Sequence, residues 1–404
     1  MRPSSAAALT LLAATVGGAL VLVVASVAGW LHTGETKTVV LRAPAPTAGD
    51  ASAPVVAAKP LVGNGFQPAQ IYRARSAGVV TVISYFDDAG VPDARAGQGS
   101  GFVVSPAGLV LTSAHVITTA GQGTDKTTTA RTVYVEFADG DRVTGHIVGA
   151  DLFDDVGVLR VDPSRHALDP VPLGNSSRVV VGQPVAAIGS PFGNVDSLSV
   201  GVVSAIRRSI PSLTSKYDLV DAIQTDAPIN HGNSGGPLFD ARGRVIGINA
   251  QIRSSDTTSG GFEGVGFAVP IDSARRSLAQ LVQTGGVKYA FVGIKTEDLT
   301  PAIARKFGYA AARGALIDQV TGGSAADKAG LVAGTKDEVY EGVGVRVGGD
   351  AIVAIAGIPV TNAQDVVRIV TTKLVPGETA NFTVVRGGAR RVVPVTLAAR
   401  TPAG

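Results

Sequence analysis

No histidine follows Ser234, and this order limits the folds in which that serine can take part in chemistry. Ser234 lies in the run Asn-His-Gly-Asn-Ser-Gly-Gly-Pro-Leu over residues 230–238, whose glycines permit a tight turn and a close approach of the backbone to a ligand. A hydroxyl beside free backbone N–H groups could attack a carbonyl group and stabilise the oxyanion that forms. A Gly-Asn-Ser-Gly run without partners would be an ordinary surface turn, so the hypothesis depends on the rest of the chain.

The order of the possible partners selects one arrangement. Residues 232–236 also fit the Gly-x-Ser-x-Gly elbow of the α/β-hydrolases, in which an acid and then a histidine follow the serine. That fold is excluded because every histidine of the chain precedes Ser234: His32, His115, His146, His166 and His231. An Asp–His–Ser order would need an acid from the polar stretch 87–93, where no strand is predicted to hold it. The order His, Asp, Ser remains, as in the chymotrypsin-like enzymes.

Short apolar runs at regular spacing predict an all-β domain over residues 67–286. The run 79–83 is almost entirely β-branched, and residues 99–104 and 109–112 flank a Pro-Ala-Gly turn, as in a hairpin. The alternating run 132–137 ends at Asp139-Gly140, which is a hairpin turn signal. Short strands at this spacing favour barrels or a sandwich. Further strands are expected at 156–161, 184–188, 200–206, 222–225, 245–251 and 266–269, with a closing helix over 271–282 that buries Ile271, Ala274, Leu278, Leu281 and Val282.

A smaller α+β domain is expected over residues 287–400, because 404 residues are too many for one ordinary core. Residues 361–364, Thr-Asn-Ala-Gln, read as a capping box at the start of a helix. The stretch 333–348, with its glycines, is expected to form a loop. Strands are expected at 315–320, 351–355, 380–385 and 392–397, and the helix face is expected to comprise Ala363, Val366, Val367 and Val370.

An uncharged run over residues 6–31 predicts a transmembrane anchor within residues 1–34. About 20 apolar residues suffice to cross a bilayer, and Trp30 suits the membrane interface. A cleaved signal peptide is the alternative, with Ser26-Val27-Ala28 as the cleavage site, although the apolar region of a signal peptide is only about 7–15 residues long. Residues 35–66 contain Ala-Pro-Ala-Pro and read as a linker. Both readings place the following domains outside the cytoplasm.

Charge and cysteine usage exclude several classes of function. The formal net charge is +3 and no block of Lys and Arg occurs, so nothing indicates a nucleic-acid partner. The absence of cysteine excludes thiol catalysis, disulfides and cysteine-based zinc sites. No metal or organic cofactor is expected.

Two further residues, both of which precede Ser234 in the sequence, complete the predicted His–Asp–Ser arrangement. His115 ends the strand 109–112 among small neighbours, where its imidazole could face a cleft, whereas His146 and His166 are expected on the surface. The acid comes from the segment that contains Asp151, Asp154 and Asp155. Asp155 is the last polar residue before an apolar strand and is the first choice, because a buried acid must orient the histidine. Asp154 is the alternative, and Asp151 fits an ordinary acidic turn.

These residues resemble the HtrA/Deg family of serine proteases. The likeness rests on Thr-Ser-Ala-His-Val at 112–116, Asp-Val-Gly-Val-Leu at 155–159, Gly-Ser-Pro-Phe-Gly at 189–193 and the stretch 223–238. In the family the aspartate opens the second of these runs, which supports Asp155. Residues 291–294 and 349–357 resemble parts of the family's PDZ module, although Ala356 replaces the usual Asn or Asp and the stretch 333–348 is long.

The resemblance implies a chymotrypsin-like double β-barrel with two six-stranded barrels, followed by one PDZ domain. It implies a serine endopeptidase in which Ser234 attacks, His115 transfers the proton and Asp155 orients His115. Gly232 and Ser234 would form the oxyanion hole, with Asn233 as a further donor. Peptide C-termini would bind the PDZ domain at Phe291, Val292, Gly293 and Ile294. The substrates would be unfolded or misfolded proteins. The enzyme would be a homotrimer and anchored in the membrane. The pocket for the residue before the cleaved bond would comprise Pro228, Ile229, Asn230 and Asn249. A PDZ-bearing chaperone or scaffold that cuts slowly or not at all is the alternative.

Overall fold

The computed structural model describes residues 65–87, 96–120, 127–189, 197–215, 217–230, 232–250 and 264–400. The predicted anchor over residues 1–34 and nearly all of the predicted linker lie outside this part of the chain. Among the described helices, none combines the length and the apolar character needed to cross a bilayer.

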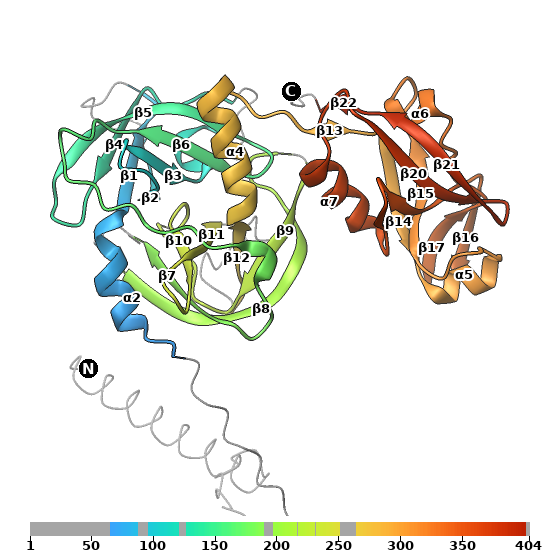
Figure 1. Cartoon of the computed structure of the whole chain (residues 1–404), viewed down its shortest axis with the longest axis horizontal. Coiled ribbons are helices and arrows are strands. Elements are labelled where there is room, and N and C mark those ends of the chain that lie inside the picture. The colour runs from blue at the N-terminus through green and yellow to red at the C-terminus, as the bar shows by residue number, and fades with distance from the viewer. Residues whose placement is uncertain are drawn as a thin grey trace, which may run out of the picture. The chain divides into compact units, whose positions relative to one another are not determined.

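The strands of the first part form two closed barrels, as predicted (Figure 1). The first barrel has the strand order β1-β2-β3-β6-β5-β4 and the second has the order β10-β11-β12-β9-β8-β7. The strands of the first barrel are β1 (Val79–Tyr85), β2 (Ala96–Val103), β3 (Leu109–Thr112), β4 (Thr132–Glu136), β5 (Arg142–Asp151) and β6 (Val156–Arg160). Those of the second are β7 (Pro184–Gly189), β8 (Ser197–Pro211), β9 (Asp218–Thr225), β10 (Pro237–Asp240), β11 (Val245–Ala250) and β12 (Gly266–Pro270).

Both hairpin turns that the sequence signals are present. The β2–β3 turn ends at Gly108, which has a φ of +87° and lies so close to the carbonyl of Val161 that a side chain would clash there. In the β4–β5 turn the Gly140 N–H donates to the carbonyl of Phe137 at 2.9 Å, and Gly140 also has a positive φ. Left-handed backbone of this kind favours glycine, which explains why the sequence marks both turns clearly.

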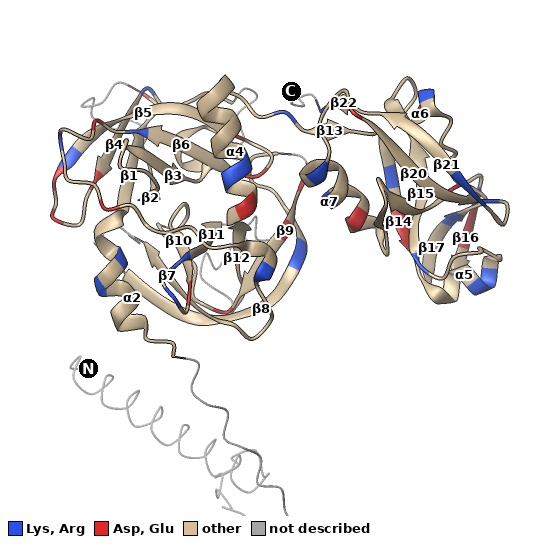
Figure 2. Cartoon of the chain, in the orientation of Figure 1, with Lys and Arg blue, Asp and Glu red and all other residues tan. Residues whose placement is uncertain are grey.

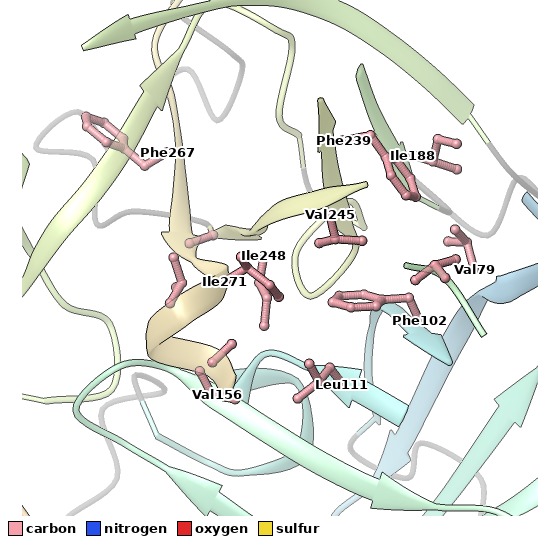
Figure 3. Packing of buried hydrophobic residues seen from close by; sticks show 14 of the residues in the cluster. Val79, Phe102, Leu111, Val156, Ile188, Phe239, Val245, Ile248, Phe267 and Ile271 are labelled. Carbon is pink, nitrogen blue, oxygen red and sulfur yellow. The ribbon is translucent and has the colours of Figure 1, made fainter. Parts of the chain in front are cut away.

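One hydrophobic core joins the two barrels (Figure 3). Phe102 and Leu111 extend into it from the first barrel, and Ile188, Phe239 and Ile248 extend into it from the second. These side chains are fully buried, and burying one large apolar side chain stabilises a fold by about 1.5–3 kcal/mol. The shared core therefore fixes the two barrels against each other, which matters because the candidate site draws residues from both.

Helix α4 (Ile271–Thr284) packs on strands of both barrels, including β5 and β11. It ends at Gly285, whose left-handed φ of +72° closes the last turn. Ile271, Ala274 and Leu281 are buried as predicted, but Val282 is 43% exposed, so the predicted apolar face was one residue too wide. Acidic and basic residues lie side by side on this helix (Figure 2), and Arg275 pairs with Asp272 at 2.9 Å. The remaining short helices of the first part are α2 (Pro68–Arg75), η1 (Ser76–Gly78), α3 (Ala114–Ile117) and η2 (Ser176–Arg178).

The second part of the chain is an α+β domain built on an antiparallel sheet. The main path of this sheet is β14-β15-β18-β20-β21, with β19 paired to β18. Its core is separate from that of the barrels and contains Ile317, Ile352, Ile369 and Phe382. Its elements are β13 (Ala290–Phe291), β14 (Ile294–Leu299), α5 (Pro301–Phe307), β15 (Gly314–Val320), α6 (Ala325–Ala329), β16 (Lys336–Tyr340), β17 (Val343–Val347), β18 (Ala351–Ile355), β19 (Ile358–Pro359), α7 (Ala363–Lys373), β20 (Thr379–Arg386), β21 (Ala389–Thr396) and β22 (Ala398–Ala399).

Three local predictions for this domain were wrong. The predicted loop over residues 333–348 contains the hairpin β16–β17, whose two-residue turn has positive φ at both Glu341 and Gly342. The N-cap of α7 is Asn362 rather than Thr361, because Asn362 accepts the N–H of Asp365 while the Asp365 carboxylate reaches back to Thr361. Val367 is 37% exposed and Ile369 is buried, so the buried face of α7 is rotated from the predicted one.

Candidate active site

His115 lies immediately after β3 in the one-turn helix α3. Its side chain is mostly buried, and its Nδ1 is 2.7 Å from Oδ2 of Asp155. Burial alone would lower the pKa of His115, but the charge of Asp155 and this hydrogen bond outweigh burial and leave the pKa raised above its ordinary value. The imidazole is thus held by a carboxylate in the way a general base requires.

Asp155 is bound to the His115 segment through its backbone as well as its side chain. Its Oδ1 accepts the backbone N–H of His115 at 2.9 Å, and its carbonyl accepts the N–H of Ala114 at 3.2 Å. Asp155 is 3% exposed and has a φ of +53°, a left-handed conformation that costs a non-glycine residue free energy and is common at functional sites.

The other two aspartates of this turn have different partners. Asp154 pairs with Arg276 of α4 at 2.9 Å. Asp151 was predicted to lie in an ordinary acidic turn, and that prediction was wrong: it is 2% exposed and accepts hydrogen bonds from Ser277 and Tyr289. Of the three candidates, Asp155 is the one that contacts His115.

The glycines after Ser234 bring the serine loop against the strand that leads to His115. Gly235 has a φ of +84°, and a Cβ there would lie 2.5 Å from Oγ1 of Thr112 and 2.8 Å from the backbone nitrogen of Ser113. Only glycine permits this approach. The Oγ of Ser234 is buried and has no hydrogen-bond partner among the described residues, and hydrogen bonds between nucleophile and base often form fully only when substrate is bound.

The loop before Ser234 presents backbone donors. Neither the Gly232 nor the Ser234 N–H has an acceptor in the described part of the chain, whereas the Asn233 N–H donates to the carbonyl of Asn230 at 3.0 Å. Asn233 is therefore not placed as a third donor, contrary to expectation. Gly232 has a φ of +98°, which again requires glycine.

Ser100 of β2 holds this loop on both sides of Asn233, and the sequence reasoning missed it. Its Oγ donates to the carbonyl of Gly232 at 2.6 Å, and its backbone N–H donates to the carbonyl of Ser234 at 2.8 Å. Ser100 is fully buried although it is polar. The available signal was a serine between Gly99 and Gly101 in a strand that continues into Phe102 and Val103, because a hydroxyl buried there needs a partner.

Two of the predicted specificity residues, Ile229 and Asn249, lie at strands β12 and β11 of the second barrel. Ile229 packs against Gly266 of β12, where a Cβ would lie 2.7 Å from the Ile229 side chain. Asn249 of β11 is fully buried, and its backbone N–H and carbonyl are bonded to Gly236 and Gly235. Asp226 is exposed, and its Oδ1 accepts the N–H of Val202 at 2.6 Å, so this carboxylate is bound to the neighbouring strand.

In the second domain, the segment Phe291–Ile294 has its carbonyl groups fixed. The carbonyl of Val292 accepts the N–H of Ala326, and that of Gly293 accepts the N–H of Thr321. In a trans peptide the N–H points away from the carbonyl, so the N–H groups of Gly293 and Ile294 face away from these partners. Within the described strands β14 is an edge of its sheet, with β15 on one side only.

No group of three or more histidine, aspartate and glutamate side chains in the described ranges is placed to hold a metal ion.

Two domain families match the chain, the trypsin-like peptidase domain over residues 99–248 and the PDZ domain over residues 290–397. The chain is 38% identical over 306 residues to a probable periplasmic serine endoprotease DegP-like of Hahella chejuensis, which covers 76% of this chain and 58% of that protein. It is 38% identical over 301 residues to protease Do-like 1, chloroplastic, of Arabidopsis thaliana, which covers 74% of this chain and 63% of that protein. The chain thus spans less than two thirds of the length of these relatives.

Solved structures agree with the domain matches. The HtrA-type protease AlgW with a tripeptide has a TM-score of 0.66 and 28% identity and covers 83% of this chain and 98% of its own. The serine endoprotease from Yersinia pestis has a TM-score of 0.56 and 26% identity, with the same coverage of both chains. The chain combines a trypsin-like peptidase domain with one PDZ domain. In both domains it is similar to the HtrA-type and DegP-like serine endoproteases named above.

Asp155→Asn is expected to lower kcat about 10⁴-fold, because the amide favours the wrong imidazole tautomer. In the wild type, kcat/KM should fall as the pH drops through a His115 pKa that lies above its ordinary value, since only neutral imidazole is a base. The variant should move this acid limb to lower pH, because burial then acts without the charge of Asp155. Asp154→Asn is the matched control, since it contacts Arg276 instead, and should change kcat less than about tenfold. Equal losses in both variants would contradict the assignment of Asp155.

Ser100→Ala is expected to lower kcat about tenfold with little change in KM. The variant frees the Gly232 carbonyl, so the neighbouring N–H groups lose their fixed direction. Complete loss of one oxyanion-hole donor lowers kcat by about 10²–10³-fold, so a partial loss of alignment should lower it less. Ser84→Ala is the control, because Ser84 is an equally buried serine on the adjacent β1 with no hydroxyl partner among the described residues. Steady-state kinetics on a fluorogenic peptide give the comparison, and unchanged kcat in folded Ser100→Ala would refute this role.

Proposed function

We propose that the protein is a serine endopeptidase that uses His115, Asp155 and Ser234. The observation that carries the proposal is the His115–Asp155 pair at 2.7 Å on the first barrel, beside a glycine-lined serine loop from the second. The relatives named as serine endoproteases support the same conclusion.

In this mechanism the Ser234 oxygen attacks the carbonyl carbon of the peptide bond while the imidazole of His115 accepts the hydroxyl proton. The N–H groups of Gly232 and Ser234 stabilise the oxyanion. His115 then returns the proton to the leaving amine as the C–N bond breaks, which leaves an acyl-enzyme on Ser234. Water, deprotonated by the same imidazole, attacks the ester and releases the acid and the free hydroxyl. Asp155 stabilises the imidazolium in both halves.

The substrates in this proposal are unfolded or misfolded chains, and peptide C-termini bind the PDZ domain at Phe291–Ile294. The outward N–H groups of Gly293 and Ile294 suit a carboxylate, and the free edge of β14 suits an added peptide strand. The HtrA-type protease AlgW is known in structures with a tripeptide and a decapeptide, which supports peptide binding here.

We further propose a domain division at 286/287, a membrane anchor over residues 1–34, extracytoplasmic protease and PDZ domains, and a homotrimer. The anchor rests on the uncharged run of the sequence, and the location agrees with relatives named periplasmic. Exposed apolar side chains on β8 and just before β7 are candidates for the contact with a second copy of the chain, because exposed apolar surface commonly marks interfaces. They are Val180, Val181, Leu198, Val200 and Val202.

Active-site labelling distinguishes this proposal from the alternative, a chaperone or scaffold with little proteolysis. A fluorophosphonate reacts only with an activated serine, so labelling with and without a PDZ-binding peptide reports whether the site is competent. The paired His115 and Asp155 favour proteolysis.

Ser234→Ala is expected to abolish cleavage of casein and labelling by fluorophosphonate while folding and peptide binding persist. Losing such a nucleophile costs about 10⁶ in turnover. Ser215→Ala, a serine outside the site, serves as the control. Cleavage by Ser234→Ala at a rate near that of the wild type would refute the proposal.

The enzyme is expected to cut after Val, Ala or Leu. Pro228, Ile229, Asn230 and Asn249 supply no carboxylate for an Arg or Lys side chain, and a buried cation without a partner is costly. Preference should be broad, since one methylene discriminates by only about 1–3 kcal/mol. Mass spectrometry of the fragments of an unfolded protein measures which residues precede the cleaved bonds. Asp226→Asn should leave the cleavage map unchanged, because that carboxylate bonds to Val202, and a map dominated by Arg and Lys would contradict this pocket.

A further inference from the structure

Asp151 is a buried carboxylate that the proposed mechanism does not use. Its Oδ1 accepts the backbone N–H groups of Phe153 at 3.0 Å and of Asp154 at 3.4 Å. Its Oδ2 accepts the hydroxyls of Ser277 and Tyr289, each at 2.6 Å. Burying such a group costs free energy unless its hydrogen bonds are satisfied, and here four donors satisfy both oxygens.

The two backbone bonds shape the turn that delivers Asp155. A carboxylate that accepts the N–H groups two and three residues later closes the turn locally. Four residues after Asp151, Asp155 takes its left-handed φ of +53° and bonds to the backbone of Ala114 and His115. Since that conformation is unfavourable for an aspartate, the surrounding structure must hold it.

The two hydroxyl bonds connect this turn to more distant parts of the chain. Ser277 belongs to α4, and Tyr289 belongs to the connector between α4 and β13. The Tyr289 ring is 2% exposed and contacts the Phe153 ring at a centroid distance of 5.1 Å. A residue of the connector thus packs on the turn and hydrogen-bonds to its carboxylate.

The charged and titratable groups around Asp151 are Asp154, Arg276, Tyr289 and Arg400. Burial, with the charge of Asp154, raises the pKa of Asp151 to about 6, while the hydroxyls of Ser277 and Tyr289 oppose this rise. Arg276 neutralises Asp154 at 2.9 Å, and Arg400 lies over the rings of Phe153 and Tyr217. Ionised Asp151 is therefore held by hydroxyl and backbone donors rather than by a direct cation.

We propose that Asp151 is a positioning residue for the triad, which fixes the turn that carries Asp155 and links it through the Tyr289 hydroxyl to the connector. The proposal rests on the proposed function only for the role of Asp155. It implies that a displacement of the connector reaches the His115–Asp155 pair through one hydrogen bond. The positional claim itself is measurable at His115 without any turnover.

The test combines peptide kinetics with NMR titration of the His115 imidazole in the full chain. Tyr289→Phe removes one hydroxyl and keeps the ring. Asp151→Ala removes all four bonds, whereas Asp151→Asn also removes the charge but keeps an oxygen for the two backbone donors. Tyr217→Phe is the matched control, because its ring contacts the same Phe153 and its hydroxyl is not bonded to Asp151.

Tyr289→Phe should lower kcat about fivefold, the value of one hydrogen bond, and Asp151→Ala about 10²-fold, the cost of a displaced catalytic group. KM should stay within about twofold if only the triad is affected. The pKa of His115 should fall in both, and further in Asp151→Ala than in Tyr289→Phe, because the contact with Asp155 loosens. Asp151→Asn should recover kcat to within about fivefold of the wild type, and Tyr217→Phe should match the wild type in both measurements.

Folded Tyr289→Phe with wild-type kcat and an unmoved His115 titration would overturn the proposal. So would Asp151→Asn with the full loss seen in Asp151→Ala, because charge rather than geometry would then be responsible. If Asp151→Ala does not fold, Tyr289→Phe still decides. A wild type that neither labels nor cleaves would refute the proposed function, while the His115 titration would continue to test the positional claim.

Discussion

The shared core of the two barrels is the constraint on which the site depends. His115 and Asp155 belong to the first barrel, and Ser234 belongs to the second, so no local interaction can set the distance between base and nucleophile. The shared core, to which Phe102 and Phe239 contribute from the two barrels, holds them in place together with the bonds of Ser100 to the serine loop. Because protein interiors are close-packed, a shift of one barrel is resisted by the whole core. Glycine at position 235 then permits the last approach of the serine loop to the strand before His115.

The features that the sequence predicts well are those with local physical causes. Turns at Gly108 and Gly140 need left-handed backbone, and the strands around them need β-branched residues, so composition marks both. The order of His115, Asp155 and Ser234 is also a property of the chain itself, and it excludes the α/β-hydrolase arrangement because no histidine follows Ser234. Even the choice of Asp155 over Asp154 follows from its place next to an apolar strand.

The features that the sequence does not predict depend on contacts between distant segments. Ser100 and Gly232 are bonded across 132 positions, and Asp151 and Tyr289 across 138, so neither pair has a local pattern. An aspartate in a short polar segment is typical of exposed turns, and only the packing of α4 and the connector buries Asp151. The N-cap of α7 lies one residue after the predicted position for a related reason. The side chains of Thr361 and Asn362 can both accept an N–H, and Asn362 accepts it because the carboxylate of Asp365 binds the Thr361 hydroxyl.

Three aspartates within five residues have three roles because their surroundings differ. Asp155 meets an imidazole and a backbone N–H, so its charge is available to stabilise an imidazolium. Asp154 meets the guanidinium of Arg276, which keeps that charge away from the imidazole. Asp151 meets only neutral donors, and burial makes its ionised form costly. One short turn can therefore hold a charge for catalysis, neutralise a second and use a third for structure, provided that each carboxylate has its own partners.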